Sequence, residues 1–219
     1  MPGEVKPRQR STRRQLQAAA TRSDILDAAE TLFLERGYAA TSVDAIAGAA
    51  NVARATVFLA CGSKVEILKS LRDLRLVGDD EPIPMLDRPW FREALEATNR
   101  DEVLRLHARN MRIICDREAG IERVLAAAAD AEPALRELYS EAHQQRAAGM
   151  RLIVEAAAAG APAPIADIES FATAVYALSG PEVYDLLVRR SGWSSDHYEK
   201  WLAATLIQQC ADSGAEYCD

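Results

Sequence analysis

The sequence has 219 residues, of which 49% are hydrophobic and only 6% aromatic, and its patterned apolar positions exclude a disordered chain. The formal net charge is −7, but the charge is unevenly distributed. Residues 1–78 hold 12 Lys and Arg against 8 Asp and Glu, which leaves −11 for the remainder. A basic N-terminal third on an acidic remainder indicates a nucleic-acid-binding head joined to a body with another role.

Targeting and metal-binding signals are absent from the sequence. It has no run of about eighteen apolar residues, and the segment MPGEVKPRQRSTRR is charged where a signal peptide needs an apolar centre. We therefore expect a cytoplasmic protein with no membrane partner. The four cysteines lack the paired spacing of a metal site, so we expect reduced thiols, no metal and no cofactor.

Residues 1–20 have no apolar period, and their basic side chains lie among Pro, Gln and Ser. We expect a disordered basic arm that lies along phosphates or in a minor groove when DNA is bound. The alternative is a merely solvated charged tail.

The next segment, residues 23–36, predicts the first helix of the head. Ile25, Ala29, Leu32 and Phe33 share one stripe, and Gly37 provides a C-terminal stop.

A tight turn between two short helices follows. Thr41 and Asp44 have the spacing of a capping box for a helix over residues 42–50. Asn51 tolerates the left-handed backbone of a sharp turn, and a third helix is predicted over residues 53–59.

Ser63 and Glu66 form a further capping box, which opens a helix that runs to about Val77 before Gly78. The arrangement predicts a three-helix DNA-binding unit of the helix-turn-helix kind, with the second short helix in the major groove.

The order ILDAAETLFLERGYAATSVDAIAGAANVARATVFLACGSKVEIL resembles the N-terminal domain of the tetracycline-repressor (TetR) family of regulators, over about forty residues without a gap. The resemblance implies an all-α protein with a DNA-binding domain at residues 21–66 and a helical ligand-binding and dimerisation domain at residues 67–219. It also implies a homodimeric transcription regulator, expected here to be a repressor that a small-molecule effector releases from double-stranded operator DNA.

In such a regulator Arg54 is expected to reach a guanine and Ala55 a thymine methyl, at half-sites roughly 34 to 36 Å apart. The residues expected to hold phosphates are Thr41, Ser42, Thr56 and Lys64.

Three residues on or beneath this DNA-facing surface depart from the family pattern. Phe58 stands where a tyrosine usually contacts phosphate, Ala60 where a histidine or tyrosine usually does, and Cys61 where a phenylalanine usually packs the core. We expect weaker DNA binding and a looser core, unless Phe58 or Leu59 turns inward.

The body is predicted to be helical throughout, because no segment alternates with period two. Three prolines within residues 81–90 forbid a continuous helix there. The predicted helices are 89–97, 101–116, 118–128, 133–159, 165–190 with a break at Gly180 and Pro181, and 195–212.

Several mixed polar and apolar residues on these helices predict a mostly apolar ligand pocket, although ordinary helix packing explains them equally well. They are His107, Asn110, Met111, Tyr139 and His143. His107 and Cys115 lie two turns apart on one apolar stripe, and this pattern favours a core or pocket role over metal binding.

The last two helices carry apolar stripes wider than one small body needs, which predicts a dimer interface. Its expected residues are Tyr184, Leu187, Tyr198, Trp201, Leu202, Thr205 and Leu206.

Two other classes of function are weighed against the regulator. An enzyme is not expected, because the sequence holds no nucleophile elbow, phosphate loop or dinucleotide fingerprint. A metabolite-binding dimer that has lost useful DNA affinity is the alternative, because of the departures at Phe58, Ala60 and Cys61.

Overall fold

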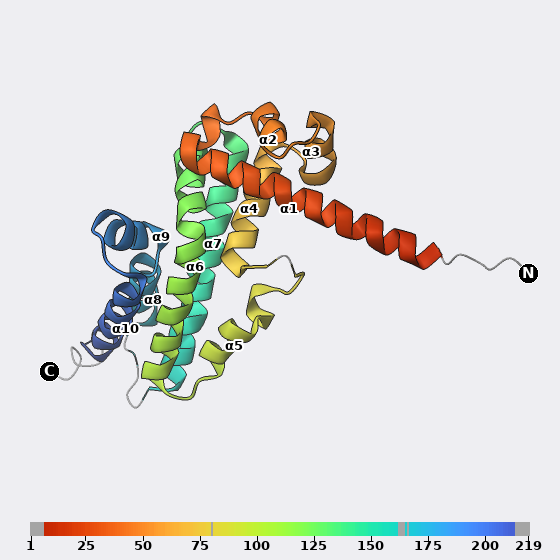
Figure 1. The fold of residues 1–219 in the computed structure, drawn as a ribbon. Coiled ribbons are helices and arrows are strands. Elements are labelled where there is room, and N and C mark those ends of the chain that lie inside the picture. Colours follow the sequence, from red (N-terminus) through yellow and green to blue (C-terminus); the bar gives the residue numbers. More distant parts are fainter. Residues whose placement is uncertain (1–6, 80, 162–164, 166, 213–219) are drawn as a thin grey trace, which may run out of the picture.

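The computed structural model describes residues 7–79, 81–161, 165 and 167–212, and these form helices and connecting segments without a strand. Helices α6 and α7 run side by side along the molecule, with the head at one end of them (Figure 1). The helices are α1 (Pro7–Ala40), α2 (Val43–Ala49), α3 (Arg54–Cys61), α4 (Lys64–Val77), α5 (Pro89–Glu96), α6 (Arg100–Ala129), α7 (Pro133–Ala159), α8 (Ile168–Leu178), α9 (Pro181–Tyr184) and α10 (Ser195–Asp212), with a 3-10 turn at Met85–Asp87 and a π-helical turn at Asp185–Arg190.

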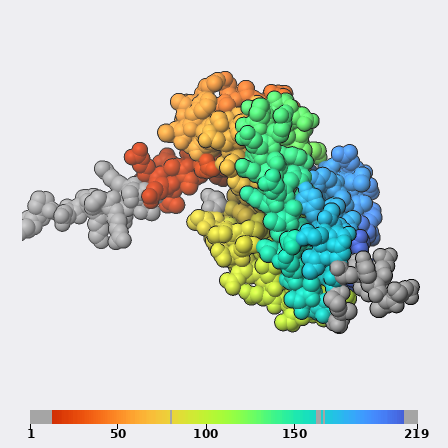
Figure 2. Space-filling view, turned by 180° about the vertical axis from the view of Figure 1, so that it is seen from behind, coloured from red at the N-terminus to blue at the C-terminus, as the bar shows by residue number. Residues whose placement is uncertain are grey.

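The prediction of a disordered arm is wrong for residues 7–20, which form the first turns of α1, while residues 1–6 lie outside the described residues. This stretch is rich in Arg, Gln and Ala, which are good helix formers, and it extends a helix already fixed by packing further along. The N-terminal part of α1 projects away from the body (Figure 1), and the coloured part of this helix also projects in Figure 2. A basic helix therefore stands where a flexible arm is predicted.

The predicted helix-turn-helix is present. Asn51 has φ +54°, the left-handed conformation expected at the turn, and α2 and α3 meet at 99°. The cap of α2 is a correction, because the Ser42 hydroxyl, not that of Thr41, accepts from the Ala45 amide at 3.1 Å. The Ser63 and Glu66 capping box of α4 is confirmed.

Helix α6 is one continuous helix of 30 residues, about 45 Å long, so the predicted break near residue 117 is wrong. The helix packs along its length against α7, α4 and α1, and a Cβ at Gly120 would lie 2.8 Å from the Leu34 side chain of α1. The glycine lets α1 approach α6 closely, and this packing offsets its cost of about 1 kcal/mol in a helix interior.

Two apolar cores share α6. The head core joins α1–α4 to the C-terminal part of α6 and the start of α7, including Ile121, Leu125 and Leu135. The body core joins the rest of α6 and α7 to α5, α8, α9 and α10. No single helix among the described residues is long and apolar enough to cross a membrane, and only the bent pair α2 and α3 meets that test jointly.

Candidate DNA-binding face and ligand cavity

Helix α3 presents one face to solvent and packs the other into the head core. Val57 and Cys61 are buried, whereas Arg54, Ala55 and Phe58 are exposed. The Arg54 guanidinium pairs with Asp44 of α2 and lies 5.5 Å from the centre of the Phe58 ring. The exposed face of α3 thus carries a cation that is held by a neighbouring carboxylate.

Thr41 cannot hold a phosphate, which corrects the sequence prediction. It is 1% exposed, and its hydroxyl lies 2.9 Å from the Gly37 carbonyl and 3.2 Å from that of Leu32. The hydroxyl closes the backbone kink where Gly37 takes φ +79°. Ser42 is exposed and Thr56 is partly exposed beside it.

Lys64 binds the end of the first helix. Its ammonium donates to the carbonyls of Tyr38 and Thr41, both at 3.0 Å, and lies 3.9 Å from the centre of the Tyr38 ring. Two of its three N–H donors are therefore used inside the head. Lys64 thus holds the end of α1 against the start of α4, with one N–H donor not used in these bonds.

The three departures from the family pattern leave the head packed. Cys61 is buried, and neither neighbour turns inward, since Phe58 is 45% and Leu59 90% exposed. Arg22 of α1 crosses the region instead and donates to the Ala60 carbonyl at 2.8 Å and to the Ser70 hydroxyl at 3.0 Å. An arginine from α1 thus links the end of α3 to the middle of α4.

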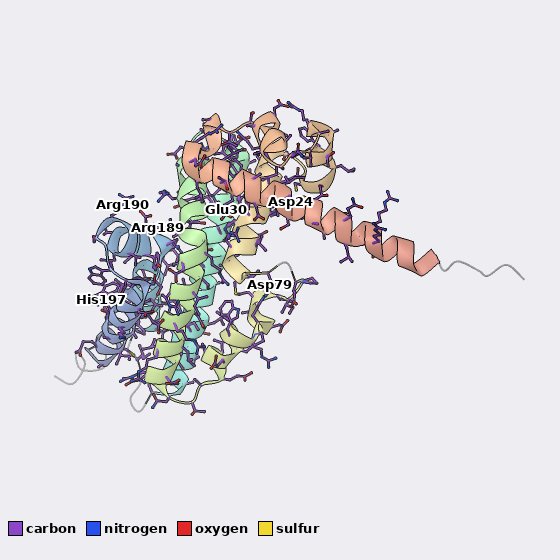
Figure 3. The ribbon with its side chains drawn as sticks, viewed as in Figure 1. Asp24, Glu30, Asp79, Arg189, Arg190 and His197 are labelled. Carbon is purple, nitrogen blue, oxygen red and sulfur yellow. The ribbon has the colours of Figure 1, made fainter. Side chains whose placement is uncertain are left out.

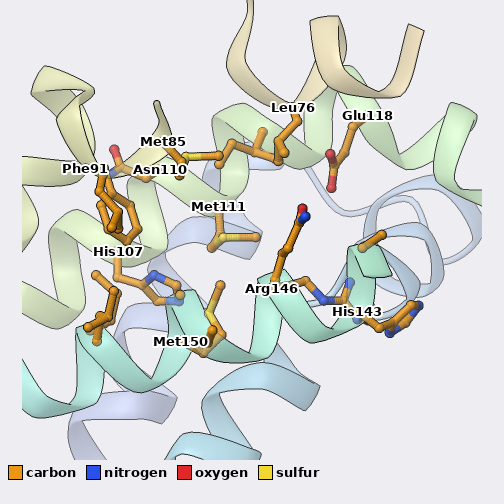
Figure 4. A pocket seen from close by; sticks show the side chains of 18 of the residues that line it. Leu76, Met85, Phe91, His107, Asn110, Met111, Glu118, His143, Arg146 and Met150 are labelled. Atoms are coloured by element: carbon orange, nitrogen blue, oxygen red, sulfur yellow. Dashed lines mark hydrogen bonds between the residues drawn. The ribbon is translucent and has the colours of Figure 1, made fainter. Parts of the chain in front are cut away.

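A cavity of about 370 Å³ lies in the body, between α6, α7, α5 and the end of α4 (Figure 4). Its wall is mainly apolar and aromatic. The predicted residues His107, Asn110, Met111 and His143 line it, together with Leu76, Met85, Trp90, Phe91, Ile114, Met150 and Ile153 among others. Tyr139 is not part of this wall but packs on the His143 ring at 4.1 Å between ring centres.

The two polar groups at one end of the cavity have protein partners. The His107 Nε2 lies 2.9 Å from the Ser179 hydroxyl, and burial lowers the pKa of His107 to about 4, so the ring is neutral. Asn110 donates to the Trp90 carbonyl at 2.9 Å. These residues shape this end without contributing charge.

Four charged residues line the other end of the cavity and were not predicted from the sequence to do so: Glu118 and Glu122 on α6, Arg72 on α4 and Arg146 on α7. Their signal is visible in hindsight, because Glu118 and Glu122 continue the stripe of Met111 and Cys115 at intervals of three and four residues. A charged residue on the continuation of an apolar stripe is buried with it.

The arginines of this cluster have acidic partners. Arg72 lies 3.7 Å from Glu122 and 3.3 Å from Asp73, and Arg146 lies 3.4 Å from Glu182 and 4.5 Å from the centre of the Tyr176 ring. Glu118 is 5% exposed, and its Oε2 has no hydrogen-bond partner in the described part of the chain. Burial, with Glu122 nearby, raises the pKa of Glu118 to about 7.

Helix α4 connects this cavity to the head. Arg72 lines the cavity, and one turn later Arg75 pairs with Glu30 of α1, which lies where α1 passes α4 (Figure 3). Arg117 of α6 donates to the Leu76 carbonyl at 3.1 Å near the end of α4. A shift of α4 at the cavity would therefore move contacts with α1.

The residues predicted for the dimer interface divide into two groups. Tyr184, Tyr198, Leu202 and Leu206 are buried in the core of their own subunit, so their placement on a free face is wrong. The physical reason is that α10 packs its apolar stripe against α6. Leu187, Trp201 and Thr205 remain partly exposed.

A family model for bacterial regulatory proteins of the tetR family matches residues 25–71. No curated protein matches the chain. Several solved structures share the fold over most of their length.

A TetR-like regulator from Rhodococcus sp. RHA1 is 22% identical, with 88% of this chain and 97% of that chain covered and a TM-score of 0.61. A regulator from Saccharomonospora viridis in complex with choline is 20% identical (86% and 96% covered, TM-score 0.65). NalD of Pseudomonas aeruginosa, the secondary repressor of a multidrug efflux pump, is 20% identical (88% and 96% covered, TM-score 0.60). The protein therefore carries the DNA-binding domain of the TetR family of regulatory proteins, joined to a body with the fold of TetR-type regulators.

Proposed function

We propose that the protein is a homodimeric transcriptional repressor that leaves its operator DNA when a small molecule enters the body cavity. The observation that carries the proposal is α4, which places Arg72 in the cavity wall and Arg75 on α1 of the head. A ligand that displaces Arg72 would act on the head through a rigid helix of 14 residues. Among the similar structures, NalD is described as a repressor and two others hold triclosan or choline.

DNA recognition is assigned to the exposed face of α3. Arg54 would exchange its pairing with Asp44 for a guanine edge, and Ala55 would meet a thymine methyl. Ser42, Thr56 and the remaining donor of Lys64 would bind phosphates, with the basic start of α1 adding charge along the duplex.

The test is fluorescence anisotropy with the protein's own promoter fragment and a scrambled fragment, at low and physiological salt. Arg54→Ala is expected to reduce the preference for the promoter about tenfold or more, because one base contact is lost. Deleting residues 1–20 should weaken binding to both fragments and flatten the salt dependence, because only phosphate neutralisation is removed. Arg136→Ala, on an exposed turn of α7, is the matched control.

A second candidate function is a ligand-binding dimer without specific DNA binding. Phe58 and Ala60 favour it, because neither side chain offers a phosphate hydrogen bond. Equal and weak binding to promoter and scrambled DNA, with ligand binding retained, would favour this candidate over the repressor.

The dimer is proposed to form through the outward faces of α8 and α10. Ala177 and Ala204 are exposed there, beside the partly exposed Trp201 and Ile207. The Ala177→Glu, Ala204→Glu double variant should sediment as a folded monomer, since it brings like charges together across a two-fold axis. Ala147→Glu, on exposed α7, should remain dimeric. A double variant that stays a dimer would move the interface elsewhere.

A further inference from the structure

One acidic group in the cavity wall has no ion-pair partner in the described part of the chain. Glu118 projects from α6 toward the space between α6 and α7 (Figure 4), and it lines the cavity while being 5% exposed. Its Oε2 accepts no hydrogen bond in the described part of the chain, and no arginine or lysine nitrogen there lies within ion-pair distance. A buried carboxyl of this kind lowers the stability of the folded protein unless a ligand supplies the missing hydrogen bond.

The two arginines of the cavity wall each have an acidic side chain within ion-pair distance, although the Nε of each lacks a hydrogen-bond partner in the described residues. Arg72 has Glu122 and Asp73, and Arg146 has Glu182 and the Tyr176 ring. Arg117 donates to the Leu76 carbonyl and does not line the cavity. Among the charged residues that line the cavity in the described part of the chain, Glu118 is therefore the one without an ion-pair partner, which disfavours an anionic ligand group beside it.

The two histidines of the wall do not change this balance. Burial lowers the pKa of His107 to about 4, and burial and Arg146 lower the pKa of His143. The His107 ring is therefore neutral near pH 7, and the shift of His143 favours its neutral form. The His143 Nε2 lies 3.9 Å from Glu122, too far for a hydrogen bond.

The rest of the wall decides between a metal ion and an organic cation. No group of three or more His, Cys, Asp or Glu residues in the described part of the chain could hold a metal ion. The wall near Glu118 instead carries Met111, Ile114 and Met150, with Trp90 and Phe91 further along. The volume of about 370 Å³ lies in the range of small-molecule sites.

We infer that the cavity takes an amphipathic organic amine, whose protonated nitrogen donates to Glu118 while its apolar part lies along the methionine and aromatic wall. This inference rests on the proposed function in one respect: it takes the ligand of this cavity to be the effector of the proposed repressor. Ligand entry would hold Glu118 as its carboxylate. The chemistry that selects the ligand is thus one charge-assisted hydrogen bond in an apolar site.

The experiment compares three probes with the same ten-carbon chain and different head groups: decylamine, decanol and decanoate. Binding to the full-length, DNA-free protein is measured by calorimetry at pH 7.5, and the fluorescence of Trp90 reports occupation of the cavity. Decylamine is expected to bind about tenfold or more tighter than decanol, and decanoate weakest. Trp193→Phe and Trp201→Phe, which lie outside the cavity wall, should keep the ligand-dependent fluorescence change, as expected if Trp90 reports it.

Glu118→Gln keeps the shape of the side chain and removes its charge. It should bring the affinities for decylamine and decanol to within about threefold, with the affinity for decanol unchanged. Glu141→Gln, on an exposed turn of α7, makes the same charge change outside the cavity and should keep the preference. Circular dichroism of each variant establishes that it is folded.

The inference is overturned if decanoate binds tightest, if none of the probes binds, or if Glu118→Gln keeps the full preference for decylamine. These outcomes leave the DNA assay untouched, so a regulator with another class of effector would still bind its promoter. Conversely, amine binding by a protein that ignores its promoter would overturn the proposed function and keep the cavity assignment.

Discussion

At the scale of single residues, Glu118 is a carboxyl group that is almost completely removed from water. Its pKa of about 7 in the folded chain stands against 4.5 as the ordinary value, because burial disfavours the charged form. Since the folded state holds the proton more tightly, stability is greatest below pH 4.5 and falls as the pH rises to 7. Each pKa unit is worth about 1.4 kcal/mol, so the loss above pH 7 is roughly 3 kcal/mol.

Glu118→Gln should therefore be more stable than the parent protein at pH 8 by roughly 3 kcal/mol, and by less than about 1 kcal/mol at pH 5. Urea unfolding at both pH values measures the difference. Glu141→Gln, on the surface, should change stability little at either pH. If the difference in unfolding free energy between Glu118→Gln and the parent were equal at pH 5 and pH 8, ionisation of Glu118 would not lower stability, and the prediction would be wrong.

At the scale of elements, the turn between α2 and α3 depends on one residue. Asn51 takes φ +54°, where a β-branched side chain clashes with its own backbone. Asn51→Val should cost about 1 to 2 kcal/mol of unfolding free energy, whereas Asn51→Gly should stay within a few tenths. Ala49→Val, two residues earlier in α2, is the control and should cost less than about 1 kcal/mol. If Asn51→Gly lowered the urea midpoint as much as Asn51→Val does, the left-handed conformation of Asn51 would not be what the turn requires.

Local chemistry made the head predictable from the sequence. Asn51, Gly78 and the Ser63 capping box each act within a few residues, so the turn and the ends of α4 follow from short-range rules. The continuity of α6 past residue 117 was not predicted, because the helices that pack along its whole length come from distant parts of the sequence. Tertiary contact decided against the local preference.

The candidate cavity was predictable in part for the same reason. His107 and Met111 lie on an apolar stripe that a helical period reveals, and they line the cavity. The charged end, with Glu118 and Arg72, was missed because charged residues are rarely buried. The orientation of α10 was also misread, since periodicity shows that a stripe is apolar but not whether its own subunit or a partner covers it.

At the scale of the whole molecule, the head is not an independent folding unit. Its core includes Ile121 and Leu125 of α6 and Leu135 of α7, all fully buried against α1–α4. A fragment of residues 1–78 would expose that apolar surface, and we expect it to lack a cooperative thermal transition by circular dichroism. A sharp transition of the isolated fragment would contradict this view of the core.

The same core predicts that a change in the body weakens the head. Ile121→Ala, which leaves a cavity beneath the head, should cost about 2 to 5 kcal/mol and lower the temperature at which promoter binding is lost. Ala127→Val, on an exposed turn of the same helix, should leave both measurements nearly unchanged.

The shared core of α6 also bears on how such regulators can be recombined. A hybrid joined at Gly78 would place this head on another protein's long helix, where the residues facing Phe33, Ile67 and Leu71 were shaped for a different partner. A workable crossover would have to carry Ile121, Leu125 and Leu135 along with the head. DNA specificity and effector specificity therefore cannot be exchanged separately at Gly78, because α6 contributes to both the head core and the body core.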